Sequence, residues 1–574
     1  MKKFNFSVLA VLVAVFVFSG CSGLNKMKKN ASEINFKTTP DVVEMHGGNV
    51  DVAIDARFPE KYFNTKAVVV ATPVLKTPSG DVEFEPVTLQ GEKVTANNKV
   101  INFKSGGKMS YKGNVPYKDE MRLSELMINV VASKGAKSVV FDPIKLADGV
   151  VSTPLLLMPQ EAETIVAKDN FQRIVPESYE ADIHYTINRA DVKSSEKKSD
   201  DIAALKDKVK AANEKDNVKF RGVEVSAYAS PDGELDFNDK LANNRSKTAT
   251  KFFKKELQDL EVNQADQDSF FSLLSTAEDW DGFKELVGQS SIQDKDLILR
   301  VLSMYNDPVV REKEIKNISS AYTELAEEIL PQLRRSKLIV NADIIGKSDD
   351  EIMKLAVDNP SELDIEELLY SAGLTEDVEL QNNIYMAATE KYPKCFRAWN
   401  DLGMTYIQLD EFEKGKNAIE RASSLYGKSP IVLNNLGVIA LAEGDFEKAE
   451  GLFRSAAGAG GEVDHNLGII NVNKGNYKQA VSNFGSTCLF NAALAQTLNK
   501  DYPGALKTLD CMEDGCALTD YLKAVVYARQ GNSSNMFKAL EAAVAAKPEL
   551  KEMAKTDIEF GKFFEDAQFK GIVQ

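Results

Sequence analysis

Histidine is scarce in this 574-residue chain, which has only His46, His184 and His465. These three lie far apart and without the spacing of metal ligands, which argues against a zinc site and against a histidine-based catalytic triad. His184 alternates with apolar neighbours, as a structural histidine on a strand does. The chain also lacks nucleophile-elbow, P-loop, dinucleotide-binding and HExxH motifs. The sequence therefore predicts a protein that is not an enzyme and that needs no cofactor and no metal.

Positive charge is in deficit as well. The chain has 70 lysines and arginines against 86 acidic residues, which gives a formal net charge of −16. Binding to nucleic acid needs clustered lysine and arginine to neutralise phosphates, whereas short basic runs such as Lys197-Lys198 stand among acids. We therefore expect no nucleic-acid partner. The hydrophobic fraction of 43% is ordinary, so a chain of this length has enough apolar side chains for several domain cores.

Long hydrophobic runs are missing after the N-terminus. At the N-terminus itself, Lys2 and Lys3 precede the apolar residues 8–18, a run that is too short to span a bilayer. Basic residues, an apolar core and the small residues Ser19 and Gly20 together predict a secretory signal peptide over residues 1–20. The rest of the chain is then expected outside the cytoplasm.

Cys21 follows directly after these small residues, a position where a plain signal peptide requires no cysteine. The Ser-Gly-Cys ending resembles the lipobox of bacterial lipoproteins, in which the cysteine becomes the lipidated first residue. This resemblance implies several acyl chains on Cys21, and two chains already suffice for stable membrane attachment. The alternative is an ordinary cleaved signal peptide with an incidental cysteine. Residues 21–31 are polar and predict a lipidated tether that reaches about 35 Å when extended.

The residues after Cys21 bear on which membrane holds the lipid. Ser22 is not the aspartate that often keeps such lipoproteins in the inner membrane. Residues 22–29 are basic, which does not resemble known surface-export signals. We therefore expect an outer-membrane lipoprotein that faces the periplasm, with exposure on the cell surface as the alternative.

Residues 32–158 are expected to form a β-sandwich of the immunoglobulin-like kind. Apolar and polar residues alternate over 50–54, and residues 67–72 are rich in valine. Turn signals such as residues 78–80 separate the runs. Short strands at this spacing are typical of a sandwich. Residues 159–179 are expected to be a linker.

Residues 180–345 mix strand and helix signals. Alternation over 183–187 and over 223–227 predicts two strands, with an amphipathic helix between them. A turn and a second helix follow the second strand. Residues 258–317 lack strand alternation and are expected to be a helical insertion, after which a last strand closes the domain.

The turn after the second strand carries a recognisable motif. Residues 227–233, Ala-Tyr-Ala-Ser-Pro-Asp-Gly, precede Asn238 and Arg245 and resemble the OmpA-like peptidoglycan-binding family. In that family a strand ends in Gly-His-Thr-Asp, turns through a glycine and enters a helix that bears an asparagine and an arginine. Arg334-Arg335 looks like the arginine pair that closes the family's β-α-β-α-β fold. The resemblance implies an α+β domain that binds peptidoglycan.

Four residues form the predicted binding set for the diaminopimelate of the wall peptide: Ser230, Asp232, Asn238 and Arg245. Asn238 and Arg245 are two helical turns apart and share one face, and an arginine fork grips a carboxylate with two hydrogen bonds. Ser230 replaces the family aspartate that holds the ligand's ammonium, and Asp232 is the candidate to take its place. The alternative is that Asn238 only caps the helix and Arg245 only makes a surface salt bridge.

From residue 350 to 574 the pattern is helical and repeats. Gly403, Gly437 and Gly468 recur after 34 and 31 residues. Trp399 and Tyr406 stand at the offsets from the first glycine that tetratricopeptide repeats show, so this part resembles that family. The resemblance implies a solenoid of paired helices whose concave groove binds a protein partner, which the sequence does not identify.

Four cysteines remain after Cys21: Cys395, Cys488, Cys511 and Cys516. Outside the cytoplasm such residues are able to form disulfides. Cys488 and Cys511 are expected at the open end of one helical hairpin, which makes them the favoured pair. Four free buried thiols are the alternative.

These features together predict a non-enzymatic, multidomain adaptor. A lipid would hold it to the outer membrane, the OmpA-like domain would hold peptidoglycan, and the repeats would hold a protein. The alternative is a surface-exposed or secretion and assembly accessory lipoprotein whose OmpA-like pocket does not bind peptidoglycan. Protease treatment of intact cells separates the two, because only a surface-exposed chain would be digested.

Overall fold

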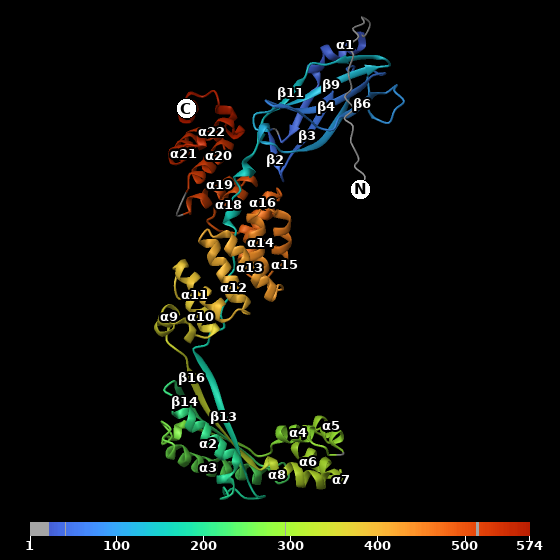
Figure 1. Ribbon diagram of the computed structural model, residues 1–574. Helices are drawn as coiled ribbons and strands as arrows, with labels where there is room; N and C mark the ends of the chain where they lie inside the picture. The colour runs from blue at the N-terminus through green and yellow to red at the C-terminus, as the bar shows by residue number, and fades with distance from the viewer. Residues whose placement is uncertain (1–21, 41, 293, 513–515) are drawn as a thin grey trace, which may run out of the picture. The chain divides into compact units, whose positions relative to one another are not determined.

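Figure 1 shows the protein as a computed structural model, which describes residues 22–40, 42–292, 294–512 and 516–574. The predicted signal peptide and Cys21 lie outside the described residues. The chain divides into two compact units, here called the first unit (Met1–Ala167 with Tyr392–Gln574) and the second unit (Lys168–Lys391). Within the described residues, no helix has both the length and the apolar character that crossing a bilayer requires.

The segment that follows Cys21 is a docked helix and not an extended tether, so that prediction is wrong. Helix α1 (Ser22–Lys29) buries Leu24 and Met27, each 2% exposed, in the core of the β-rich part. The Tyr62 hydroxyl donates a hydrogen bond to the Met27 carbonyl oxygen over 2.9 Å. Each buried apolar side chain of this size contributes about 1.5–3 kcal/mol. The free energy gained by burying these two side chains offsets the conformational entropy that the segment loses when it becomes ordered.

Two sheets form the β-rich part of the first unit, as the sequence predicts. Buried and more exposed residues alternate along β3 (Asn49–Phe58), because successive side chains point to opposite faces. The buried set faces a core shared with the second sheet. The first sheet has the order β1 (Asn35–Thr39), β3, β2 (Val43–His46) and β12 (Val150–Val151), with β8 (Gly107–Pro116) paired to β3. The second has the order β10 (Lys137–Val140), β9 (Glu125–Lys134), β4 (Val68–Thr77), β6 (Val87–Gly91) and β7 (Lys99–Ile101), with β11 (Ile144–Asp148) on β9 and β5 (Gly80–Glu83) on β4.

The C-terminal part of the first unit is a run of helix pairs, here called the solenoid. The repeated glycines lie where the two helices of a pair approach each other. A Cβ atom on Gly403 would lie 2.9 Å from the Gly415 carbonyl oxygen, and one on Gly437 would lie 2.5 Å from the Phe453 ring. The period in the sequence therefore reflects a steric requirement that recurs in the pairs that carry these glycines. The pairs are α12 (Phe396–Gln408) with α13 (Phe412–Tyr426), α14 (Pro430–Ala442) with α15 (Phe446–Ser455), α16 (Gly461–Asn473) with α17 (Tyr477–Phe484), α18 (Phe490–Leu498) with α19 (Tyr502–Asp510), and α20 (Ala517–Arg529) with α21 (Ser533–Ala546), followed by α22 (Leu550–Thr556) and α23 (Ala567–Val573).

The second unit contains a four-stranded sheet whose one face is covered by two helices. The strand order is β13 (Ile174–His184), β16 (Arg335–Ile345), β14 (Val218–Tyr228) and β15 (Phe271–Thr276). Helices α2 (Asp200–Asn213) and α3 (Leu235–Asp259) bury their apolar stripes against this sheet. The core includes Leu205 and Phe253 from the helices and Val225 and Leu338 from the strands.

The stretch 258–317 is not a purely helical insertion, so this prediction is wrong in part. It contains β15, which pairs in parallel with β14 and completes the sheet. Only the first residue of β15 is buried, so the strand shows none of the alternation that reveals a half-buried strand. The inserted helices span 280–333 and share a core of their own that includes Phe283 and Leu302. They are α4 (Trp280–Gln289), α5 (Lys295–Met304), α6 (Pro308–Lys316), α7 (Ser319–Glu324), a π-helical turn (Leu325–Ile329) and α8 (Leu330–Leu333).

Three further helices end the second unit: α9 (Asp349–Asp358), α10 (Ile365–Ala372) and α11 (Val378–Lys391). Helices α9 and α10 each begin with a capping box, in which the first side chain and a glutamate three residues later satisfy each other's backbone N–H groups. This local device explains why both helices begin directly after Ser348 and Asp364.

Candidate functional site

A pocket of about 290 Å³ lies in the second unit, where β14 ends and α3 begins. All four residues of the predicted ligand-binding set line it, together with Arg334. The turn between strand and helix places Ser230 and Asp232 on one side, and the first turns of α3 supply Asn238 and Arg245. The sequence motif therefore describes one place in the fold.

Arg245 borders this pocket but exposes none of its surface. Its Nε donates to the Arg189 carbonyl oxygen over 3.0 Å, and its Nη1 donates to the Tyr228 carbonyl oxygen over 2.7 Å. The guanidinium carbon also lies 4.9 Å from the centre of the Tyr185 ring. Loss of hydration on burial lowers the pKa of Arg245 to about 10. The side chain is thus held by main-chain carbonyl groups and makes no surface salt bridge.

Arg334 is the cation that faces the pocket. Its Nη2 lies 3.2 Å from Asp232 Oδ2, and its Nε donates to Ser230 Oγ over 3.3 Å. Ser230 in turn donates to the Asp232 carboxylate. The Arg334 and Asp232 side chains are 11% and 16% exposed, so both are reached from the pocket. Asp232 therefore supplies a carboxylate next to Ser230, the position where the OmpA-like motif has an aspartate.

Asn238 holds the shape of the turn. Its Nδ2 donates to the carbonyl oxygens of Ser230, over 3.1 Å, and of Gly233, over 3.3 Å. It lies inside α3, whose N-cap residue is Glu234, so the alternative that Asn238 caps this helix is wrong. With 4% of its surface exposed, Asn238 fixes the walls of the pocket.

The neighbouring Arg335 points to a different cluster. Its Nη2 lies 3.4 Å from Asp279 Oδ2, and its guanidinium lies 5.5 Å from the centre of the Tyr228 ring. Asp279 also accepts the Gly282 N–H and so begins helix α4. The two arginines of the pair therefore differ in position: Arg334 lines the pocket, and Arg335 joins the inserted helices to the sheet.

A second candidate site lies on the solenoid, where residues 153–167, here called the cis segment, run along the first helices of successive pairs. Three asparagines each bind one residue of the segment through both its N–H and its C=O groups. Asn435 holds Ile165 at 2.8 and 2.9 Å, and Asn466 holds Glu163 at 2.8 Å in both directions. Asn491 holds Met158 at 2.9 and 2.7 Å. Each side-chain amide thus makes the two hydrogen bonds that a residue of a neighbouring strand would make.

The segment and the repeats advance in step. Ala167 donates its N–H to Asp401 Oδ1 over 2.7 Å, two residues beyond Ile165 and one helix pair earlier. Further amides link the rungs, because Asn400 and Asn434 each bond to the next asparagine and to a carbonyl oxygen of the segment. We call this set the asparagine ladder: Asn400, Asp401, Asn434, Asn435, Asn466 and Asn491, each at most 1% exposed.

Side chains of the cis segment add contacts of their own. The Glu161 carboxylate accepts the N–H groups of Phe490 and Asn491, at the positive N-terminal end of α18. Ile165 is 7% exposed and belongs to the solenoid core. From the sequence, residues 153–158 are expected in the β-sandwich and residues 159–179 in a linker, and the repeats are expected to bind another protein. In the structure, the first helices of four pairs hold the chain's own segment.

Asp401 makes the ladder sensitive to pH, and we expect Asp401→Asn to show it. Burial raises the pKa of Asp401 from 3.8 to about 7, so the folded protein retains a proton that the unfolded chain has lost. Stability should therefore fall as the pH rises from about 4 to about 7, by about 2–4 kcal/mol from this group. An asparagine keeps the acceptor for Ala167 and does not titrate. Unfolding in denaturant across this pH range should give a flatter profile for the variant, and parallel profiles would contradict the assignment.

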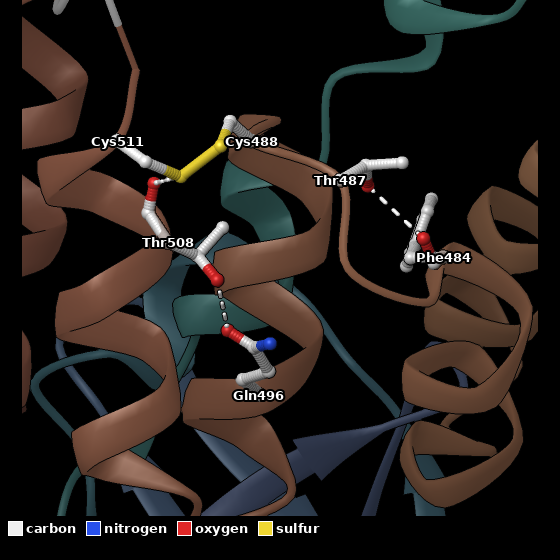
Figure 2. Close-up of a disulfide and its surroundings, with 6 residues drawn as sticks. All are labelled: Phe484, Thr487, Cys488, Gln496, Thr508 and Cys511. Carbon is white, nitrogen blue, oxygen red and sulfur yellow. Dashed lines mark hydrogen bonds between the residues drawn. A yellow bond between two sulfur atoms is a disulfide. The ribbon is translucent and has the colours of Figure 1, made fainter.

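A disulfide joins Cys488 and Cys511, the pair that the sequence favours, with 5.6 Å between their Cα atoms (Figure 2). It links the start of α18 to the end of α19. Within the same hairpin, Thr508 Oγ1 donates to Gln496 Oε1 over 2.9 Å. Cys395 and Cys516 are free thiols.

Comparison with known proteins supports the prediction of tetratricopeptide repeats in the C-terminal part. A family model described as tetratricopeptide repeat matches residues 400–462. No curated protein matches the chain. Among solved structures, the pilF protein of Pseudomonas aeruginosa is 16% identical with a TM-score of 0.28, over 38% of this chain and 100% of that one. A tetratricopeptide repeat protein from Parabacteroides merdae is 14% identical with a TM-score of 0.27, over 37% and 91%. The family match confirms tetratricopeptide repeats in the C-terminal part of the chain.

Proposed function

We propose that this protein is a non-enzymatic adaptor lipoprotein of the bacterial outer membrane that faces the periplasm. Its OmpA-like domain would bind peptidoglycan, and its repeats would serve protein interaction. The observation that carries the wall-binding part is the pocket at the end of β14, where one acid and one cation, Asp232 and Arg334, lie side by side. The repeats carry the interaction part, since stacked helix pairs of this family offer extended binding surfaces.

The charges of the pocket suit diaminopimelate, which carries a carboxylate and an ammonium on the same carbon. Arg334 would take the carboxylate through its guanidinium, and Asp232 would take the ammonium. Arg245 would support the pocket from behind, since it holds the Tyr228 carbonyl oxygen at the end of β14. The binding role that the sequence gave to Arg245 thus moves to Arg334.

Sedimentation with purified peptidoglycan tests this assignment. We expect Arg334→Ala and Asp232→Asn each to weaken binding by about 10- to 100-fold, because a hydrogen bond to a charged group contributes about 1.5–3 kcal/mol. Arg221→Ala is the matched control, since Arg221 lies near the opposite end of β14 and its side chain is 65% exposed. Wild-type binding by Arg334→Ala would rule out this pocket as the wall site.

Membrane fractionation tests the lipid anchor. We expect Cys21→Ser to move the protein from the membrane to the soluble periplasmic fraction, while Cys395→Ser remains with the membrane. Because α1 begins at Ser22 and is docked on the β-rich part, the lipid would hold that part without a flexible spacer. A Cys21→Ser protein that stays in the outer-membrane fraction would disprove anchoring through this residue.

A further inference from the structure

The asparagine ladder has the features of a peptide-binding site. We propose that it recognises a peptide that makes one turn at an acidic residue and carries an aliphatic residue four positions later and a small residue two positions after that. The cis segment occupies the site in the resting chain. This inference deepens the protein-interaction part of the proposed function and rests on that part alone. Glu161, Ile165 and Ala167 supply this pattern in the chain itself.

The ladder binds main-chain groups of the segment, so the path of the ligand's backbone decides whether it binds. Asn435, Asn466 and Asn491 each donate to a carbonyl oxygen and accept from the N–H of the same residue. Between the Met158 and Glu163 positions the segment makes a 3-10 turn at Pro159–Glu161, so the ladder requires a backbone that turns once and then continues without helix to Ala167. A proline would remove an N–H at each position that the ladder uses. Pro159 stands between those positions, next to Met158, and its missing N–H costs nothing there.

Side chains define the sequence of the ligand. Glu161 accepts two N–H groups at the start of α18, a nine-residue helix whose positive end favours a carboxylate. His465 lies beside it and contacts the Glu161 carbonyl oxygen at 2.9 Å through Nε2. Ile165 enters the apolar core, and Ala167 is 2% exposed, which leaves no room for a larger side chain.

The composition of the ladder suits it to bind a peptide backbone more than to pack against a spacer. All five of its asparagines, Asn400, Asn434, Asn435, Asn466 and Asn491, are fully buried. Buried amides are costly unless every polar atom is paired, and an apolar surface would hold a simple spacer more tightly. The amides bond to main-chain groups of the segment and to one another, so removing the segment would leave without partners the amide groups that bond to it.

Covalent linkage explains why the site is closed at rest. The cis segment begins two residues after β12, and Thr153 donates to the carboxylate of Glu559 in the solenoid. A short connection of this kind gives an effective concentration of about millimolar, which a separate peptide of equal affinity has to overcome. A partner would therefore bind only when the segment is released.

The test uses the full chain and a fluorescent synthetic peptide with the sequence of residues 153–168, followed by anisotropy. A released variant, Glu161→Ala with Ile165→Asp, weakens the cis segment and leaves the ladder intact. We expect this variant to bind the peptide at least tenfold more tightly than the wild type does. Adding Asn435→Ala to the released variant should abolish binding, and a peptide carrying the same two changes should not bind.

Equal binding by the wild type and the released variant would overturn the proposal, and so would absence of binding by a folded released variant. If the double change unfolds the protein, Ile165→Ala replaces it, with the same peptide and the same required tenfold difference. Neither variant alters the pocket of the second unit or Cys21. Peptidoglycan sedimentation and membrane fractionation of the same proteins therefore report separately on the rest of the proposed function.

Discussion

Replacement of Arg529 by methionine is expected to lower the free energy of unfolding of the first unit by about 3–5 kcal/mol. Arg529 ends helix α20 and is 9% exposed, and its Nε lies 2.9 and 3.0 Å from the two carboxylate oxygens of Glu559. The Glu559 side chain is only 5% exposed. Without its partner, this carboxylate would stay buried as an unpaired charge, which is the costly half of breaking a buried ion pair. Denaturation monitored by circular dichroism gives the measurement.

A double variant separates the loss of the pair from the exposure of one charge. Arg529→Met with Glu559→Met removes both charges and is expected to recover much of the stability lost in the single variant. Lys555→Met with Glu552→Met is a matched control, because that pair lies nearby and its side chains are 39% and 77% exposed. A cost below about 1 kcal/mol for Arg529→Met, a value typical of exposed pairs, would show that this pair is hydrated in solution.

The Arg529 pair also concerns the cis segment. Glu559 accepts the hydrogen bond from Thr153, and Glu44 of the β-rich part lies 3.9 Å from Arg529. One cluster therefore joins strand β2 of the β-rich part, the first residue of the segment and the end of the solenoid. We expect the single variant to make residues 153–167 more accessible to protease than they are in the wild type.

Features that depend on local chemistry were predictable from the sequence. The glycine period marks helix pairs because a Cβ at Gly403 or Gly437 would collide with the partner helix, wherever the pair lies in the protein. The turn at 230–233 and the helix after it share one short stretch of chain, so the motif located the pocket. Alternation along β3 and β14 likewise reflects one buried face.

Features that depend on distant parts of the chain were not predictable in this way. Leu24 and Met27 look like two isolated apolar residues until the core of the sheets receives them. The asparagines stand in the repeats as polar residues near the repeated glycines. The partner of Asn435 lies 270 positions away in the chain, and that of Asn491 lies 333 positions away. No periodicity within the repeats points to residues 153–167. Strand β15, at the edge of the sheet, was missed for a different reason: both of its faces are exposed, so its sequence shows no alternation of apolar and polar residues.

Arg245 lies where the spacing in the sequence predicts, but its hydrogen-bond partners differ from the prediction. Seven residues from Asn238, it does lie at the pocket. Its guanidinium, however, turns toward carbonyl groups of residues 186 and 189 as well as Tyr228, and the first two belong to the loop after β13. Such a destination depends on the tertiary path of that loop, which the motif does not contain.

Arg245→Met is therefore expected to destabilise the second unit by about 3–5 kcal/mol. The change removes the donors from the partly buried carbonyl oxygens of Tyr228 and Arg189, at about 1–3 kcal/mol each, and it removes the contact with the Tyr185 ring. Arg221→Ala, with an exposed side chain, should change stability by less than about 0.5 kcal/mol. Denaturant unfolding of the full chain, followed by a probe in the second unit, gives both values.

Wall binding by the same variant distinguishes support from direct contact. Under conditions where Arg245→Met remains folded, we expect it to sediment with peptidoglycan better than Arg334→Ala does, because Arg334 and Asp232 still line the pocket. A variant with unchanged unfolding free energy and no wall binding would show the opposite: the guanidinium would then have to leave its carbonyl partners and reach the ligand itself. Stability and binding measured on one pair of arginines thus decide which of them is the ligand's partner and which holds the pocket in shape.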